Sequence, residues 1–331
     1  MGLTITEKIL SRALVSGNLV KGSRIGIKAD QTLTHDLNGI MSYLVLEAIG
    51  LDSKKVELAV QYIDHNMIQA DHKNADDHNF ILDMTSKLGI ITARSGSGIC
   101  HALHLEHFAA PGKVLIGGDS HTVAAGGIGS FAVGVGGFDN AMAIAGQPFY
   151  FTMPKIVRVN LTGRLQPFVS AKNIILELLR IVGVKGGVGK IFEYGGDGVK
   201  TLSISERSTI ANMGAETGAT TSVFPSDENT RLWLKAFDRE KDYIPLDADP
   251  DAEYDDVIEI HLDELEPLIA LPSQPDNVVK VKEVEGVKVD QVMIGSCTNA
   301  SLQDILSIAN ILDGEIVSKD VELGVYPSTK T

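Results

Sequence analysis

Histidines and carboxylates with the spacing of acid–base pairs follow two expected strands and open one expected helix. Asp64 and His65 lie in the segment YIDHN, and Asp119 and His121 lie in the segment GGDSHT. His101 opens a helix after SGSGIC. The carboxyl ends of parallel strands share one edge of a sheet, so we expect the three segments to form one site. An imidazole whose tautomer and pKa are fixed by a carboxylate is suited to general acid–base catalysis.

A carboxylate and a cysteine in later segments extend this set. Glu216 lies among small residues in IANMGAETGATTSVFP, where a carboxylate needs a partner or shifts its pKa. Asn212 precedes it by one helical turn and is expected on the same helix face. Cys297 lies on the turn of IGSCTN, after an apolar run that predicts a buried strand. It is one of two cysteines and the sequence has no Cys-x-x-Cys, so its partners stay open.

The remaining histidines and the other cysteine are interpreted as surface or core residues. His101, His104 and His107 are three residues apart on one expected helix, which permits metal coordination by the first two. We nevertheless expect His104 and His107 on its solvated flank, and Cys100 in the core as a small apolar residue. The histidines expected at the surface are His72, His78 and His261. The alternative from another enzyme class is a mononuclear metallohydrolase with the ligands His101, His104, Asp119 and His121.

An α/β scaffold is expected to position these residues. The predicted strands cover 24–30, 55–63 and 113–119, and the predicted helices cover 35–49, 75–88 and 99–109. This alternation predicts a mostly parallel sheet covered by helices on both faces, which is a three-layer α/β/α architecture. The Gly- and Ala-rich residues 123–147 indicate close backbone approach.

We expect two complete domains and a third that is incomplete. Residues 1–155 form the first α/β domain with the His/Asp segments, and residues 156–272 form the second, with a helix capped by Ser170 and the Glu216 segment. Residues 273–331 contain a linker and the start of a truncated α/β domain with Cys297. One helix and two strands do not close a core, so we expect exposed apolar surface near 288–326, with self-association or disorder there.

Composition narrows the classes of protein that fit. The 331 residues are 44% hydrophobic and 22% charged, as in a globular protein, and the net charge of −14 argues against nucleic-acid binding. Two cysteines fit a reducing compartment, and we expect a cytoplasmic protein without a secretion signal or membrane span.

Taken together, these segments resemble the aconitase superfamily of iron–sulfur hydro-lyases. The matching segments, in order along nearly the whole chain, are DQTLTHD, YIDHN, GSGICHALHLEHFAAPGKVLIGGDSHT, KGGVGKIFEYGGDGV, ANMGAETGATTSVFP and IGSCTN. The block over 185–225 is similar to the aconitate hydratase branch, and to bacterial aconitate hydratases in particular. At His35 aconitases commonly carry Gln, whereas isopropylmalate dehydratases carry sequences like the THD of this chain.

The resemblance implies a role for each of these residues. Cys297 would hold one iron of a [4Fe–4S] cluster, whose other two cysteines would come from a Cys-x-x-Cys beyond Thr331. Asp64 and His65 would protonate the departing hydroxyl. The supporting imidazole–carboxylate pairs would be His101 with Asp119 and His121 with Glu216. The substrate-binding residues would be His35 and Ser120, and Asn212 would lie beside the cluster ligands.

The implied activity is a reversible hydration by a lyase. The first expectation is aconitate hydratase, which isomerises citrate and isocitrate through cis-aconitate in the tricarboxylic acid cycle. The alternative is the large subunit of a 3-isopropylmalate or homoaconitate dehydratase. The partners are then a di- or tricarboxylate substrate and the C-terminal cluster and swivel regions, in the same chain or a separate subunit. Without them we expect this chain alone to be an inactive fragment.

Overall fold

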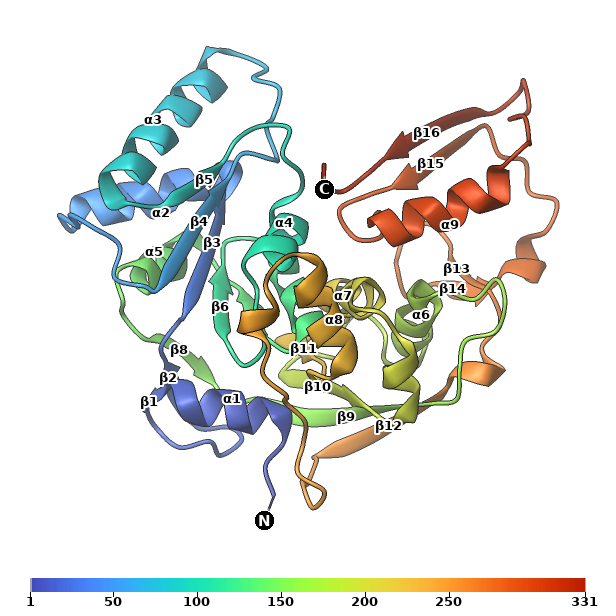
Figure 1. The fold of residues 1–331 in the computed structure, drawn as a ribbon, viewed down its shortest axis with the longest axis horizontal. Coiled ribbons are helices and arrows are strands. Elements are labelled where there is room, and N and C mark those ends of the chain that lie inside the picture. Colours follow the sequence, from blue (N-terminus) through green and yellow to red (C-terminus); the bar gives the residue numbers. More distant parts are fainter. Residues whose placement is uncertain (1, 331) are drawn as a thin grey trace.

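The computed structural model describes residues 2–330 as three α/β parts. In Figure 1 the first part lies at the left, the second at the lower centre and the third, in red, at the upper right. The first part is built on a five-stranded sheet, the second on a four-stranded sheet and the third on a parallel strand pair. The expected α/β fold with mostly parallel sheets is therefore confirmed.

The first sheet is wholly parallel and has the strand order β5–β4–β3–β6–β7. Its strands are β3 (Gln31–His35), β4 (Leu58–Tyr62), β5 (Ile91–Ala93), β6 (Val114–Gly117) and β7 (Phe131–Gly134). Val114 and Ile116 join one apolar cluster, whereas Leu115 between them joins another. Because alternate residues of a strand point to opposite faces, the two clusters cover the two faces of the sheet.

Helices complete both layers over this sheet. The first cluster receives residues of α1 (Ile5–Ala13), α2 (Asp36–Ala48), α3 (His72–Leu88) and α5 (Gly137–Ile144). The second cluster receives residues of α4 (Cys100–His107) and the 3₁₀ helix η1 (Ser120–Ile128). Thr4 caps α1 in a capping box with Glu7. The sheet thus has helices on each face, as the alternation of elements predicts.

The central strand β3 is the main difference from the predicted elements. The segment expected as the first strand forms only β2 (Arg24–Ile27), which pairs antiparallel with β1 (Leu14–Ser16) and β8 (Phe149–Thr152) in a separate sheet. All five residues of β3 are buried, although four of them are polar. Their side chains find partners inside the protein: the Gln31 amide donates to the Phe108 carbonyl at 2.9 Å. A buried strand made of polar residues lacks the apolar run by which strands are recognised.

The second part repeats the architecture around a second parallel sheet, of order β11–β10–β9–β12. Its strands are β9 (Lys155–Thr162), β10 (Lys190–Gly195), β11 (Thr221–Val223) and β12 (Asp256–His261). Its helices are α6 (Ala171–Val182), α7 (Ile204–Met213) and α8 (Glu228–Ala236). Ser170 is the N-cap of α6, as predicted, and its backbone N–H donates to the Asn173 side chain at 2.9 Å.

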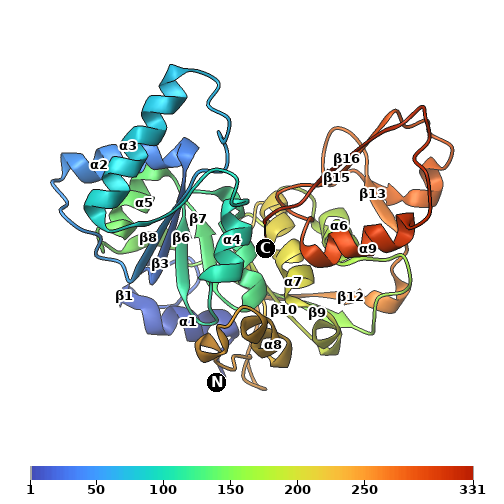
Figure 2. The same cartoon turned by 45° about the horizontal axis from the view of Figure 1, so that its top comes forward.

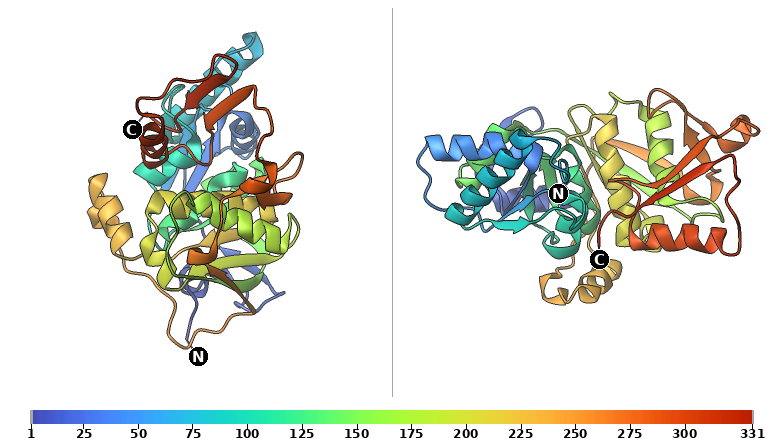
Figure 3. Two further views of the ribbon diagram at one scale, coloured as in Figure 1. Left: turned by 90° about the vertical axis from the view of Figure 1, so that its right-hand side faces the viewer. Right: turned by 90° about the horizontal axis from the view of Figure 1, so that it is seen from above.

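A close backbone contact joins the first two parts. Helix α7 packs directly on η1, near the centre of the molecule in the views of Figure 3. A Cβ atom at Gly127 would lie 2.5 Å from the Ser208 backbone nitrogen, and one at Gly126 would lie 1.8 Å from the Ser222 carbonyl oxygen. The Gly–Gly pair therefore lets two backbones approach more closely than any side chain permits.

A hairpin precedes the third part. Its first strand lies before the stretch expected as a linker, and its second strand lies within that stretch. Strands β13 (Leu268–Ala270) and β14 (Val278–Lys280) pair antiparallel. Beyond them, β15 (Gln291–Gly295), α9 (Leu302–Leu312) and β16 (Glu322–Tyr326) form one parallel β–α–β unit. No described residue of α9 is buried, and Met293 and Tyr326 are more than half exposed. The expected apolar surface in this region is confirmed.

Short 3₁₀ helices connect the remaining elements. They are η2 (Asp197–Thr201), η3 (Gly214–Thr217), η4 (Glu240–Asp242), η5 (Leu262–Glu264) and η6 (Val281–Val284). Within residues 2–330, no helix has both the length and the apolar character that a membrane span requires.

Candidate active site

The carboxyl ends of β3, β4 and β6 bring the His/Asp segments together at one edge of the first sheet. His35 is the last residue of β3, Asp64 and His65 follow β4 by two and three residues, and Asp119 follows β6 by two. His101 enters from the first turn of α4, which lies at the centre of Figure 2 facing α7 and the end of the chain. The structure thus assembles these segments as expected.

The loop after β4 is held by a carboxylate that the sequence analysis missed. Asp36, the first residue of α2, is buried and accepts hydrogen bonds from the backbone N–H groups of Asp64 (3.2 Å), His65 (2.9 Å) and Asn66 (2.6 Å). His78 approaches Asp36 from α3 at 3.6 Å. His78 is buried, so the expectation that it lies at the surface was wrong. Acidic residues are common at the start of helices because they interact favourably with the helix dipole. The sequence pattern therefore gives no sign that Asp36 also holds the loop after β4.

His65 lies between two buried carboxylates. Its Nδ1 is 2.9 Å from Asp64 and its Nε2 is 3.6 Å from Asp119. The hydrogen bond with Asp64 raises the pKa of His65 more than partial burial lowers it, and the charge of Asp119 adds to the rise. Burial alone would raise the pKa of Asp64, but hydrogen bonds from His65 and the Cys100 backbone hold it below its ordinary value. The arrangement favours an imidazolium that can donate a proton.

His35 stacks on His65 with ring centroids 4.0 Å apart. Its Nε2 donates to the Gly118 carbonyl at 2.9 Å, and its Nδ1 accepts from the Leu37 backbone N–H at 3.3 Å. Burial lowers the pKa of His35, and the neighbouring charge of His65 lowers it further. His35 is therefore a neutral ring with both nitrogens engaged, lying flat against the charged one.

Asp119 links His65 to a second histidine. His101 Nδ1 lies 3.4 Å from Asp119 Oδ1, and the same oxygen accepts the His121 backbone N–H at 2.8 Å. Burial would raise the pKa of Asp119, but the interactions with His101 and His35 lower it far below the ordinary value. Asp119 is thus a permanent carboxylate shared by His65 and His101.

The second part of the chain contributes Glu216 from η3. Glu216 lies 3.5 Å from His121 Nε2, and Ser120 Oγ lies 3.2 Å from His121 Nδ1. This group is more exposed than the His65 group, since Glu216 keeps 44% of its side chain accessible. Because η1 and η3 belong to different parts, the pair bridges the contact between them.

The IGSCTN turn of the third part closes over His101. His101 Nε2 lies 2.5 Å from the Cys297 carbonyl oxygen, and the Thr298 hydroxyl donates to the Asn212 side chain at 2.8 Å. A cavity of about 40 Å³ lies between His101, Asn212 and Cys297. All three parts of the chain therefore meet at one site.

The position of Cys297 suits one ligand of an iron–sulfur cluster. It is the one exposed thiol among residues 2–330, on a turn after a strand end, whereas Cys100 is buried. A [4Fe–4S] cluster with three protein ligands requires two further thiolates, and the one other cysteine among residues 2–330 is the buried Cys100.

His104 contradicts the alternative metal site. It is fully buried, with Nδ1 3.0 Å from the Tyr62 hydroxyl and Nε2 3.1 Å from Gln31 Oε1. Burial lowers the pKa of His104 to about 3, with a contribution from the charge of Arg239. The expected solvated position was wrong for His104, although His107 is exposed. Since both nitrogens of His104 are used, the proposed set of metallohydrolase ligands does not assemble.

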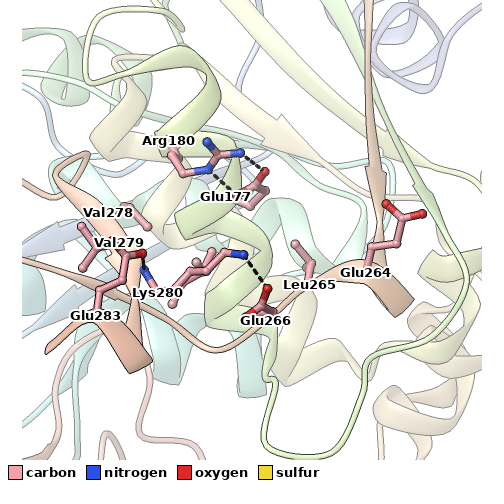
Figure 4. Close-up of a pocket in the computed structure, with 10 residues that line it drawn as sticks. Glu177, Arg180, Glu264, Leu265, Glu266, Val278, Val279, Lys280 and Glu283 are labelled. Atoms are coloured by element: carbon pink, nitrogen blue, oxygen red, sulfur yellow. Dashed lines mark hydrogen bonds and ion pairs between the residues drawn. The ribbon is translucent and has the colours of Figure 1, made fainter. Parts of the chain in front are cut away.

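A charged groove of about 490 Å³ lies away from this site, between α6 and the β13–β14 hairpin (Figure 4). Its basic side chains point at acidic ones: Arg180 pairs with Glu177, and Lys280 pairs with Glu266. Paired charges leave no convergent group for a ligand, so the groove does not compete with the His/Asp site.

Comparisons with known proteins give a consistent family. The model of the aconitase family (aconitate hydratase) matches residues 7–286. 3-Isopropylmalate dehydratase large subunit 2 of Archaeoglobus fulgidus is 37% identical over 330 residues, which are 100% of this chain and 79% of the relative. Large subunit 1 of Thermotoga maritima is 38% identical over 333 residues, with the same coverage of 100% and 79%. Mitochondrial aconitate hydratase of Saccharomyces cerevisiae is 41% identical over 317 residues, covering 88% of this chain and 40% of the relative.

Proposed function

The chain belongs to the aconitase family of hydro-lyases, and from this premise we propose that it acts as the large subunit of a 3-isopropylmalate-type dehydratase. The observation that carries the reaction type is His65, held between Asp64 and Asp119 with a raised pKa. The substrate class is supported by the relatives that match the whole chain, which are isopropylmalate dehydratase large subunits. The first expectation, aconitate hydratase, is supported less well, because the relative of that name covers 88% of the chain.

Removal of water from a hydroxy acid requires an acid for the hydroxyl, and His65 supplies it. Asp64 fixes the His65 tautomer through Nδ1, so Nε2–H is the proton that is transferred. Asp119 lies 3.6 Å from Nε2 and holds the positive charge before transfer. After His65 has given up its proton, the two carboxylates favour its reprotonation from water. The same ring can then accept a proton in the reverse hydration.

The remaining pairs are proposed to orient the substrate. His101 and His121 lie with ring centroids 5.8 Å apart, and His101 Nε2 lies against the Cys297 carbonyl. Cys297 would hold one iron of a [4Fe–4S] cluster, which when bound supplies a Lewis acid for the hydroxyl. Asn212 holds the turn through Thr298. Ser120 is proposed to contact a substrate carboxylate.

Several requirements are proposed to be met outside residues 1–331. These are two cluster cysteines, the arginines that bind the carboxylates, and the base that removes the carbon-bound proton. Each isopropylmalate dehydratase relative is longer than the matched region, since this chain covers 79% of its length, and each is named a large subunit. We propose further sequence and a small subunit as their sources.

A substrate panel tests this function. The assembled enzyme, with its small subunit and anaerobically reconstituted iron and sulfide, is assayed with 3-isopropylmalate, citrate and homocitrate. We expect brown protein and the highest kcat/KM for 3-isopropylmalate. A preference for citrate would restore the aconitate hydratase interpretation, and colourless protein containing one zinc would remove the cluster chemistry altogether.

A further inference from the structure

The thiol of Cys100 has no place in the proposed reaction, yet it lies inside the site. The sequence suggests a small core residue, and the side chain is indeed fully buried. Its sulfur, however, lies 3.9 Å from His101 Nδ1. The sulfur, the His101 nitrogen and an Asp119 oxygen all lie within 4.8 Å of one another. A buried thiol, imidazole and carboxylate so close together make a compact set of potential metal ligands.

The spacing of these atoms suits one small ion. Tetrahedral zinc with ordinary bond lengths separates its sulfur, nitrogen and oxygen ligands by roughly 3.3–3.6 Å. The observed separations are 3.9 Å between Cys100 Sγ and His101 Nδ1 and 3.4 Å between His101 Nδ1 and Asp119 Oδ1. The Cys100 sulfur and the Asp119 oxygen lie within 4.8 Å of each other, so side-chain shifts that draw the three atoms together would complete the coordination.

His101 is already oriented as a metal ligand would be. Its Nε2–H donates to the Cys297 carbonyl at 2.5 Å, which leaves Nδ1 facing Cys100 and Asp119. Ligating histidines commonly donate their other ring N–H to a backbone carbonyl in this way. In the neighbouring sets His35 uses both ring nitrogens on the backbone, and His65 uses Nδ1 on Asp64 while its Nε2 lies 3.6 Å from Asp119.

Charge and softness select the class of ion. A thiolate, a carboxylate and a neutral imidazole carry two negative charges, so a divalent cation gives a neutral centre that tolerates burial. Thiolate ligands favour zinc, cadmium and cobalt over magnesium and calcium, which prefer oxygen.

We propose that Cys100, His101 and Asp119 form a binding site for a soft divalent cation of the zinc class, whose binding inhibits the enzyme. The cation displaces the thiol proton of Cys100 to solvent and forms bonds to Sγ, Nδ1 and a carboxylate oxygen. The His101–Asp119 pair is then withdrawn from catalysis. Binding is independent of the proposed function, and only the inhibition rests on it.

Cobalt titration of the 331-residue chain tests binding without any activity. A Cys297→Ser background removes the exposed thiol, and Cys100→Ser is made within it. We expect a thiolate-to-cobalt charge-transfer band and tetrahedral d–d bands in the background variant. The band should disappear with Cys100→Ser, and the apparent Kd for Co²⁺ should rise by at least about tenfold. Cys100→Val keeps the position apolar and should lose the band equally. This control shows that the band is lost with the thiol and not because serine adds a polar group.

Two results would overturn the site. One is the absence of a charge-transfer band in the Cys297→Ser background, and the other is its persistence after Cys100 is replaced. For the inhibitory role, the assembled enzyme is titrated with Zn²⁺. We expect the inhibiting concentration to rise at least about tenfold in the Cys100→Ser variant. Equal inhibition of both proteins would contradict the inhibitory role. It would not affect the evidence for cation binding from the cobalt titration.

Discussion

At the scale of single residues, burial decides which histidines carry charge. The hydrogen bond with Asp64 raises the pKa of His65, whereas burial lowers the pKa of His35 and of His104. The hydrogen bonds also fix the tautomer of His104: Nδ1 accepts from the Tyr62 hydroxyl, and Nε2–H donates to Gln31. His35 and His104 are thus held as neutral rings, and His65 is the ring that we propose as the proton donor.

The neutral His104 predicts a specific dependence of stability on pH. Its pKa is about 3 in the folded chain against an ordinary 6.5, so only the unfolded chain takes up this proton as the pH falls from about 6.5. The contribution of neutral His104 to the free energy of unfolding is complete above pH 6.5. It is lost on acidification, by about 1.4 kcal/mol per pH unit. We expect the stability difference between the wild type and His104→Gln to shrink accordingly between about pH 6 and pH 4.5.

Urea unfolding at several pH values measures this difference. His72→Gln serves as the matched control, because His72 is exposed at the start of α3 and should leave the slope unchanged. A difference between wild type and His104→Gln that stays constant with pH would contradict a buried neutral His104.

The sequence allowed the grouping of the candidate acid–base residues to be predicted, but not the residues that support them. Asp64, His65, Asp119 and His101 lie in segments whose pattern of strand ends is visible, and the structure brings them together. Their supports depend on contacts between elements that no local pattern encodes. Asp36 and Cys100 are examples, since each acquires its position only when β3, β4 and α4 are assembled.

At the scale of elements, the decisive contact is η1 against α7. It sets the His121 side of the site, since His121 lies in η1 and its partner Glu216 in η3 follows α7 directly. The Gly- and Ala-rich sequence predicts close packing here, and the predicted helices and most strands of the first part are present. Strand β3 could not be predicted, because its buried polar residues are stabilised by side-chain hydrogen bonds from other elements.

Gly127→Ala tests this contact. The added Cβ would meet the Ser208 backbone at 2.5 Å, and a helix backbone cannot move aside as a side chain can. We expect the free energy of unfolding to fall by about 1–3 kcal/mol, measured by urea denaturation. Gly136→Ala is the control, since nothing lies within 4 Å of a Cβ there. An equal loss in the two variants would contradict the tight contact.

At the scale of the whole molecule, one site draws on three parts of the chain. The first sheet supplies the His/Asp groups, η3 supplies Glu216 and the third part supplies the Cys297 turn (Figure 1). The third part is also the least covered, with exposed apolar residues on β15 and α9. The Cys297 turn of the site therefore belongs to the least covered part of residues 2–330.

The most direct test of the account is the steady-state kinetics of the assembled enzyme with 3-isopropylmalate, comparing the wild type, His65→Asn and the exposed control His72→Gln. If His65 protonates the departing hydroxyl, kcat should fall by about 10²–10⁴ in His65→Asn, while KM changes far less and His72→Gln matches the wild type. A His65→Asn enzyme that keeps kcat within about tenfold of the wild type would contradict the central claim, as would a wild type that does not dehydrate 3-isopropylmalate.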